Sequence, residues 1–309
     1  MSNSSKWQVT RRDFLRATGV AAAAAWTGSA RAGEAVPTAV ARIGLVTDSH
    51  FADIDTRGTR HYRESLDKMH ECVALMNDKQ VDFLVELGDF TNGAEKGETA
   101  HLEAIESIYR GFEGPRYHVL GNHDLDSLSK QAFQAVVTNT GIGAERTYYS
   151  FDRAGLHVVV LDANFNPDGS PYDTGNFHWA DANIPGHELE WLDADLAANG
   201  LPAIVCCHQL LDMDEGAVAV RNASAVREVL ERHGGVLAVF QGHHHAGQHN
   251  EVAGIHYYTL KAMVEGGGAD NSAYAIAEVF ADGGILITGY RRAESMVFDR
   301  GEAVSAPSR

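Results

Sequence analysis

The sequence predicts an α/β fold in which short buried strands alternate with amphipathic helices. From about Val40 onward, short apolar runs alternate with stretches whose apolar residues recur at helical spacing. Toward the C-terminus the helical stretches stop and strand-like runs follow one another directly. This order is typical of one domain with either a mixed sheet or two sheets packed face to face, flanked by helices.

The individual elements follow from the same patterns. Continuous apolar runs indicate buried strands, whereas apolar residues three or four positions apart, such as Leu66, Met69 and Val73, indicate a helix. In chain order we expect a strand at 43–47, a helix at 63–78, a strand at 81–87, a helix at 99–109, a strand at 116–120, a helix at 129–137, strands at 147–151 and 156–161 forming a hairpin, a helix at 187–199, a strand at 203–207, a helix at 223–232, and strands at 236–240, 255–260, 274–280 and 285–288.

Residues 1–32 are similar to a twin-arginine export signal. A segment containing Arg11-Arg12 precedes a weakly apolar run at 17–28, and Ala30-Arg31-Ala32 then offers a small-x-small cleavage site. An ordinary amphipathic first helix is the alternative. The export interpretation implies the twin-arginine export machinery as a partner, cleavage after Ala32, a functional domain at 33–309, and a periplasmic or secreted protein. No apolar stretch long enough for a membrane span follows, so no stable membrane anchor is expected.

Charge and cysteine content bear on the partners of the chain and on its covalent cross-links. The formal net charge of −17 argues against a nucleic-acid polymer as partner, because proteins that bind one usually carry a basic surface. A small phosphorylated substrate is still compatible with this charge, since bound divalent cations would reverse the local field. The chain has three cysteines, Cys72, Cys206 and Cys207, and this odd count with two adjacent residues predicts no disulfide framework.

Polar residues of metal-binding types follow five of the predicted strands. In chain order they are Asp48-Ser49-His50, Gly88-Asp89-Phe90-Thr91-Asn92, Gly121-Asn122-His123-Asp124, His208, and Gly242-His243-His244-His245. In an open α/β sheet, ligands bind outside the carboxyl ends of the strands, so these clusters can converge on one site. Imidazole, carboxylate and amide oxygen together suit Mn, Fe or Zn.

Hydrolysis of a phosphate ester explains such a set of ligands. Two divalent metals about 3.5–4 Å apart activate a water molecule and neutralise the phosphoryl oxygens. Holding two cations that close together requires a bridging carboxylate with mixed nitrogen and oxygen ligands around it. The glycines before Asp89, Asn122 and His243 allow tight turns and close backbone approach.

These five motifs in this order resemble the calcineurin-like metallophosphoesterase superfamily. The resemblance implies two mixed sheets packed as a sandwich in a four-layer α/β/β/α arrangement, and hydrolysis of phosphodiester or pyrophosphate bonds by a metal-bridging hydroxide. It also implies two divalent ions (Mn, Fe or Zn) and a small phosphorylated substrate such as a nucleotide. By the same resemblance Asp48, His50 and His245 bind one metal, Asn122, His208 and His243 bind the other, and Asp89 bridges them. The resemblance also implies that Asn122 and His123 contact the substrate. It makes Asp89 and His123 the catalytic residues.

The chain departs from the family pattern at Asn92. Many relatives have an Asp at this position that orients the catalytic histidine, whereas Asn92 carries no charge to stabilise an imidazolium.

Outside the metal motifs, the chain is similar to manganese-dependent ADP-ribose/CDP-alcohol diphosphatases. The similar segments include Arg60-His61-Tyr62-Arg63, which makes Arg60, Tyr62 and Arg63 candidates for substrate binding, although Arg63 equally fits a solvated helix face. A long loop carries Phe165, Tyr172, Phe177 and Trp179, and these rings either stack on a nucleobase or close the edge of the core.

Three alternatives to this interpretation have different site requirements. A phosphomonoesterase would use the same metals on a smaller substrate. A non-catalytic metal-binding protein on the same fold would be expected to have lost a ligand or His123, and the sequence retains them all. A two-metal deacylase or peptidase would need an acidic general base near the metals, and Glu86 is the candidate for that role.

Overall fold

The computed structural model describes residues 38–93 and 99–299. The predicted signal segment 1–32 and the cleavage site after Ala32 therefore lie outside the described residues. The part that carries the predicted site is one compact unit beginning at Ala39.

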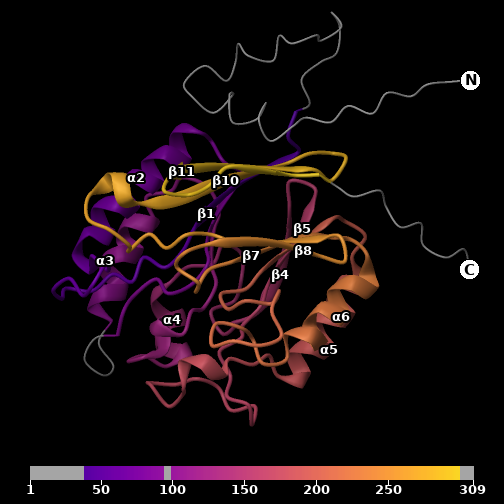
Figure 1. The fold of residues 1–309 in the computed structure, drawn as a ribbon, viewed down its shortest axis with the longest axis horizontal. Helices are drawn as coiled ribbons and strands as arrows, with labels where there is room; N and C mark the ends of the chain where they lie inside the picture. Colours follow the sequence, from indigo (N-terminus) through magenta and orange to yellow (C-terminus); the bar gives the residue numbers. More distant parts are fainter. Residues whose placement is uncertain (1–37, 94–98, 300–309) are drawn as a thin grey trace, which may run out of the picture. The chain divides into compact units, whose positions relative to one another are not determined.

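Two six-stranded sheets form the centre of this unit (Figure 1). The first has the order β12-β11-β10-β1-β2-β3, and its strands are β1 (Ala41–Val46), β2 (Phe83–Glu86), β3 (Arg116–His118), β10 (Ala273–Val279), β11 (Ile285–Arg291) and β12 (Met296–Phe298). The second has the order β4-β5-β6-β7-β9-β8, and its strands are β4 (Tyr149–Arg153), β5 (Leu156–Val160), β6 (Ala203–Cys206), β7 (Val236–Gln241), β8 (Gln248–Val252) and β9 (Ile255–Thr259). Strands β1–β3 are parallel to one another, as are β5, β6, β7 and β9.

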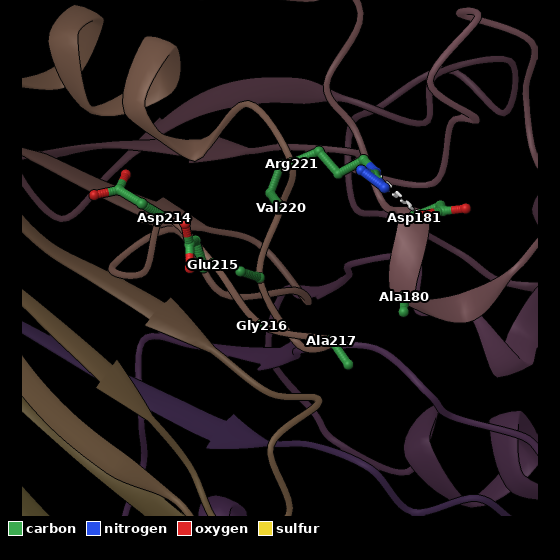
Figure 2. Close-up of a pocket in the computed structure, with 9 residues that line it drawn as sticks. Ala180, Asp181, Asp214, Glu215, Gly216, Ala217, Val220 and Arg221 are labelled. Atoms are coloured by element: carbon green, nitrogen blue, oxygen red, sulfur yellow. Dashed lines mark hydrogen bonds and ion pairs between the residues drawn. The ribbon is translucent and has the colours of Figure 1, made fainter.

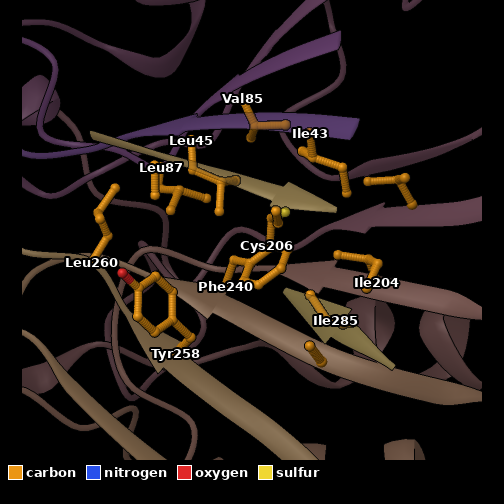
Figure 3. Packing of buried hydrophobic residues seen from close by; sticks show 14 of the residues in the cluster. Ile43, Leu45, Val85, Leu87, Ile204, Cys206, Phe240, Tyr258, Leu260 and Ile285 are labelled. Atoms are coloured by element: carbon orange, nitrogen blue, oxygen red, sulfur yellow. The ribbon is translucent and has the colours of Figure 1, made fainter. Parts of the chain in front are cut away.

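Three apolar cores separate four layers. The central core lies between the sheets and contains inward-facing residues of both, including Leu45 and Val85 of the first sheet and Ile204 and Phe240 of the second (Figure 3). The outer face of the first sheet packs on α2 (Ser65–Asp78), α3 (Ala100–Tyr109) and α4 (Lys130–Val136). The outer face of the second packs on α5 (Gly186–Ala198) and α6 (Ala223–His233). The four-layer α/β/β/α arrangement is confirmed.

The elements expected from the sequence are all present, with ends shifted by a few residues. The structure adds four short 3₁₀ helices, η1 (Tyr62–Glu64), η2 (His123–Leu125), η3 (Trp179–Asp181) and η4 (Ala269–Asn271), and two edge strands, β8 and β12. Strand β8, with the sequence Gln-His-Asn-Glu-Val, lacks an apolar run because it lies at the sheet edge and is largely exposed. Its hydrogen bonds to β9 define it as a strand despite its polar residues.

Parallel pairing brings the predicted site segments together. The carboxyl ends of β1, β2 and β3 meet at one edge of the first sheet, and those of β6, β7 and β9 meet at one edge of the second. Each of the polar clusters singled out in the sequence follows one of these strands. All three cysteines are buried and free, as expected. Among the described residues, no helix has the length and apolar character needed to cross a membrane.

Candidate metal centre

The polar side chains that follow the five strands converge on one small region. The Nε2 atom of His50 lies 3.1 Å from Nε2 of His245 and 3.5 Å from Oδ2 of Asp89. That same Asp89 oxygen lies 3.1 Å from Nε2 of His208. Oδ1 of Asp48 lies 3.4 Å from Nε2 of His245. Residues separated by nearly two hundred positions in the chain are thus brought together by the two sheets.

Three overlapping groups of side chains have ligand atoms close enough to hold a metal ion. They are Asp48 with His50 and His245, His50 with Asp89 and His123, and Asp89 with His208 and His243, and within each group the ligand atoms all lie within 4.8 Å of one another. His50 and Asp89 each belong to two of the groups. His244 belongs to none of them.

Several of these atoms are buried without a hydrogen-bond partner. Oδ1 of Asp48, Oδ1 of Asn122 and Nε2 of His243 are inaccessible to solvent, and each lacks a hydrogen bond. Leaving such atoms unpaired costs about 1–3 kcal/mol each. Metal–ligand bonds would satisfy them, and the mixed oxygen and nitrogen donor set suits a first-row divalent cation. The residues present therefore fit divalent metal ions.

The backbone at the site is held in an unusual conformation. Asp48, His50, Asp89 and His243 all have positive φ, between 45° and 64°. Residues other than glycine adopt this left-handed conformation at a cost of about 1–3 kcal/mol each. Such strain is typical of functional sites, where the turns direct several side chains toward one point.

Two glycines allow the turns to approach each other closely. A Cβ atom on Gly121 would lie 2.0 Å from the backbone nitrogen of Asp89, and a Cβ on Gly242 would lie 2.1 Å from Oγ1 of Thr47. Any side chain at either position would push two ligand-bearing turns apart. The expected role of the glycines before Asn122 and His243 is thereby explained.

Hydrogen bonds from outside the cluster orient its imidazole rings. Nδ1 of His208 donates to the carbonyl of Leu87 at 2.8 Å, because a carbonyl oxygen can only accept. Nε2 of His208 therefore faces Asp89, and it becomes a metal-binding lone pair only when its proton is lost. His245 is oriented similarly, since its Nδ1 lies 2.6 Å from Oε1 of Glu265. Sequence reasoning missed Glu265, which follows β9 and is the sixth strand-end residue at the site.

Asp124 ties two of the site's turns together. Its Oδ1 accepts a hydrogen bond from the backbone N–H of Thr91 at 3.0 Å, and its Oδ2 accepts one from Gly121 at 2.9 Å. These bonds join the turn after β2 to the turn after β3. Asp124 therefore has a structural role.

Histidines determine the charge state of the two buried aspartates. Burial by itself would raise the pKa of Asp48, but the neighbouring imidazoles of His245 and His50 hold it well below its usual range. Burial likewise acts to raise the pKa of Asp89, and the charges of His208 and His123 reverse that effect. Both carboxylates are consequently ionised at neutral pH, as metal ligands must be.

The histidines of the site differ in the direction of their pKa shifts. Burial alone would lower the pKa of His208, but the charge of Asp89 raises it to about 10. For His50 and His243 burial dominates and lowers the pKa to about 4 and about 3, respectively. Without metal, His208 is thus protonated at neutral pH, and its proton balances the charge of Asp89.

His123 has a carboxylate partner that the sequence pattern did not predict. Its Nδ1 lies 2.7 Å from Oδ2 of Asp126, three residues further along η2. Burial acts to lower the pKa of His123, but the charges of Asp89 and Asp126 outweigh it and raise the pKa. Asp126 supplies the charge that Asn92 lacks. The i, i+3 spacing of His123 and Asp126 was the available signal for this pairing.

The three residues suggested for substrate binding lie in different surroundings. Arg60 lies beside the site, with its Nε 3.8 Å from Glu265. Tyr62 is 4% exposed and packs in an apolar cluster with Ala52, Ala262 and Val264. Arg63 forms ion pairs with two exposed aspartates, Asp53 and Asp55. The contacts of Tyr62 and Arg63 are thus structural, and substrate binding by the three residues stays a prediction.

A cavity of about 400 Å³ lies beside η3 (Figure 2). One wall contains Ala180 and Asp181 of η3, and the other is the segment 214–221, which follows His208 in the chain. An ion pair between Arg221 and Asp181 joins the two walls. Trp179, next to Ala180, is 45% exposed, and its ring centroid lies 5.8 Å from that of His243.

Comparison with known families identifies the scaffold. Residues 41–247 match the profile of the calcineurin-like phosphoesterases. The chain belongs to this family. Residues 8–27 match the profile of the twin-arginine translocation signal sequence. The chain is therefore a metal-dependent phosphoric ester hydrolase that carries a signal for export to the periplasm or for secretion.

Two relatives with the same name resemble the chain over most of its length. The manganese-dependent ADP-ribose/CDP-alcohol diphosphatase of Oryza sativa subsp. japonica is 26% identical over 300 residues, which cover 82% of this chain and 92% of the relative. The protein of the same name from Danio rerio is 24% identical over 318 residues, which cover 82% and 96%.

Solved structures show the same fold. A dimetal phosphatase from Danio rerio aligns with a TM-score of 0.72 and 21% identity, and the alignment covers 85% of this chain and all of that one. A purple acid phosphatase from yellow lupin aligns with a TM-score of 0.55 and 13% identity, over 87% of this chain and 55% of that one. At these identities the likeness shows the fold alone.

We expect metal loading of the calcineurin-like site to release protons. A divalent cation binds neutral imidazole, and the metal-free protein holds a proton on His208 up to about pH 10. At pH 7 about one proton should leave His208 on binding, so metal affinity should increase as the pH rises toward 10. Calorimetric titration with Mn²⁺ in buffers of different ionisation enthalpy measures the number of protons released.

Two histidine variants test whether the released proton comes from His208. His208→Asn should release about one proton fewer than the unsubstituted protein. His233→Asn is the matched control, because His233 also binds an aspartate, Asp193, at 2.7 Å but lies outside the site. An equal number of protons released from all three proteins would contradict the protonation of His208.

Proposed function

We propose that this chain uses two divalent cations to hydrolyse the pyrophosphate or phosphodiester bond of a nucleotide-type substrate. The observation that carries the proposal is the position of Asp89. One of its oxygens lies 3.1 Å from Nε2 of His208 and 3.5 Å from Nε2 of His50, and these histidines belong to different candidate ligand groups. A carboxylate that faces both groups at once is what a pair of adjacent cations requires.

The ligands divide between the two cations as follows. Asp48, His50 and His245 would hold one, Asn122, His208 and His243 would hold the other, and Asp89 would contact both. Mn, Fe and Zn all accept this donor set, and the manganese dependence named for the relatives favours Mn. When bound, the cations lower the pKa of a water molecule and neutralise charge on the phosphoryl oxygens.

His123 and Asp126 act on the leaving group. His123 borders the ligand groups, with its ring centroid 4.7 Å from that of His50. Its raised pKa favours the protonated form, which donates a proton to the departing oxygen. Asp126 holds the proton on Nδ1, so that Nε2 is the atom available for this transfer.

The organic part of the substrate extends beyond the phosphate. Trp179 lies on the His243 side of the site, with the two ring centroids 5.8 Å apart, and it directly precedes Ala180 and Asp181, which line a cavity. The exposed ring of Trp179 stands at this side and offers a flat face to a planar group. Both features, together with the ADP-ribose and CDP-alcohol named for the relatives, support a nucleoside diphosphate linked to an alcohol or sugar.

The substrate class is tested with purified protein reconstituted with Mn²⁺. The panel contains ADP-ribose, CDP-choline, bis-p-nitrophenyl phosphate, p-nitrophenyl phosphate and cyclic AMP. We expect turnover that requires metal, with ADP-ribose or CDP-choline preferred. Asp89→Ala should lose about 100-fold or more in kcat/KM, because it removes the shared carboxylate. Asp168→Ala, an exposed loop aspartate that binds Ser170, is the control. Preference for p-nitrophenyl phosphate would favour a phosphomonoesterase instead.

Removing the charge of Asp126 should change the pH dependence of catalysis. Asp126 is one of two carboxylates that raise the pKa of His123. Asp126→Asn therefore lowers this pKa, and protonated His123 is lost at a lower pH. We expect the fall in kcat at high pH to shift down by about one pH unit. A pH–rate profile at saturating metal measures the shift.

Asp152→Asn is the matched control for this prediction. Oδ1 of Asp152 lies 2.7 Å from Nδ1 of His157, which reproduces the distance between Asp126 and His123 at a place outside the site. Its profile should coincide with that of the unsubstituted protein. If Asp126→Asn also left the profile unchanged, His123 would not be the group that donates the proton.

Trp179 should contribute to binding of the organic group. Trp179→Ala should raise KM for the preferred nucleotide substrate about two- to tenfold with little change in kcat, because stacking contributes about 0.5–1.5 kcal/mol equally before and during the reaction. Trp179→Phe keeps a flat ring and should retain most of the affinity. A loss confined to kcat would mean that Trp179 acts through His243 and not on the substrate.

A further inference from the structure

Two predicted ligands of the same metal are carried by different sheets. Asn122 follows β3, which belongs to the first sheet, and His208 follows β6, which belongs to the second. The backbone hydrogen bonds of each sheet fix positions within that sheet only. The distance between Asn122 and His208 must therefore be set by contacts between the two turns.

The side chain of Asn164 makes such a contact. Its Nδ2 donates to the carbonyl of Leu120 at 2.8 Å, two residues before Asn122. Its Oδ1 accepts from Nε2 of Gln209 at 2.8 Å, directly after His208. Asn164 and Gln209 are fully buried, so water does not compete for either bond. One amide thus links the two segments.

Asn164 is itself held in a single orientation. Oδ1 of Asp162 accepts hydrogen bonds from both the backbone nitrogen of Asn164, at 3.0 Å, and its Nδ2, at 3.1 Å. The other oxygen of Asp162 pairs with Lys130 of α4. The backbone N–H of Asp162 donates to Glu188 of α5 at 2.8 Å. Helices on the outer faces of both sheets therefore contribute to fixing Asn164.

We infer that Asn164 is a positioning residue that sets the spacing of Asn122 and His208 and thereby the affinity of the metal they share. The inference rests on the proposed two-metal function. Asp48, His50 and His245, which the proposal assigns to the other metal, make none of these bonds. Loss of the Asn164 link should accordingly lower the affinity for one metal ion and leave the affinity for the other unchanged.

The test is an equilibrium titration of the full chain with Mn²⁺, in which the paramagnetic resonance signal of free Mn²⁺ reports each binding step. The unsubstituted protein should bind two Mn²⁺ per chain. Asn164→Ala should bind one with unchanged affinity and the other about 10–100-fold more weakly, as is usual when a residue that orients a ligand is removed. At saturating Mn²⁺, kcat should recover to within about threefold of the unsubstituted value.

Three further variants separate positioning from a general effect on folding. Asn164→Asp keeps the shape but loses the donor to Leu120, so it should behave as Asn164→Ala does. Gln209→Leu removes only the bond to the turn after β6 and should also weaken one metal, which keeps the test decisive if the Asn164 variants fail to fold. Asn166→Ala is the matched control, since Asn166 bonds Ser170 in the same loop and should bind Mn²⁺ normally.

The possible outcomes distinguish this inference from the proposed function. If the unsubstituted protein binds fewer than two Mn²⁺ and shows no turnover, the two-metal function itself is wrong. If the unsubstituted protein binds two and the folded Asn164 variants weaken both alike or neither, the function stands and the positioning role is wrong. If both the Asn164 and the Gln209 variants bind one Mn²⁺ more weakly and the other normally, the inference is supported.

Discussion

The need to balance two buried carboxylates determines the rest of the site. Asp48 and Asp89 are almost completely removed from solvent. Among the described residues their ion-pair partners are all histidines, and several of these carry raised pKa values because of the carboxylates. An isolated buried carboxylate is strongly disfavoured. Protons on imidazole balance the charge in the metal-free protein, and divalent cations take over this role when they bind.

Metal binding is also connected to the stability of the fold. Four cluster residues have positive φ, and this conformation costs about 1–3 kcal/mol for each residue. The ligand atoms also come from turns on both sheets, which are otherwise joined mainly by apolar packing. Binding to the folded state alone stabilises it by about 2.7 kcal/mol when the free ligand is at 100 times its Kd. Metal ions therefore offset the strain and hold the two sheets together.

The fold and the residues that converge at the site could be predicted from the sequence because both depend on patterns local in the chain. Apolar periodicity located the elements that enclose the cores, and each cluster residue directly follows such a strand. Strand β8 was missed because an exposed edge strand needs no apolar face. Asp126, Glu265 and Asn164 were missed for a different reason. Asp126 and Glu265 each bind a cluster histidine, and Asn164 binds neighbours of two cluster residues; only the three-dimensional arrangement shows which residues those bonds join.

The wide spacing of the cluster along the chain has a consequence for biosynthesis. The side chains run from Asp48 to His245, and Glu265, which orients the last of them, lies further on still. A ribosome-bound chain lacks these residues until the segments of both sheets have been synthesised, so no complete site exists before both sheets have formed. Since twin-arginine export carries folded proteins, the chain completes its site in the cytoplasm. A site completed there is available to the cytoplasmic pool of divalent cations before the chain meets the medium outside.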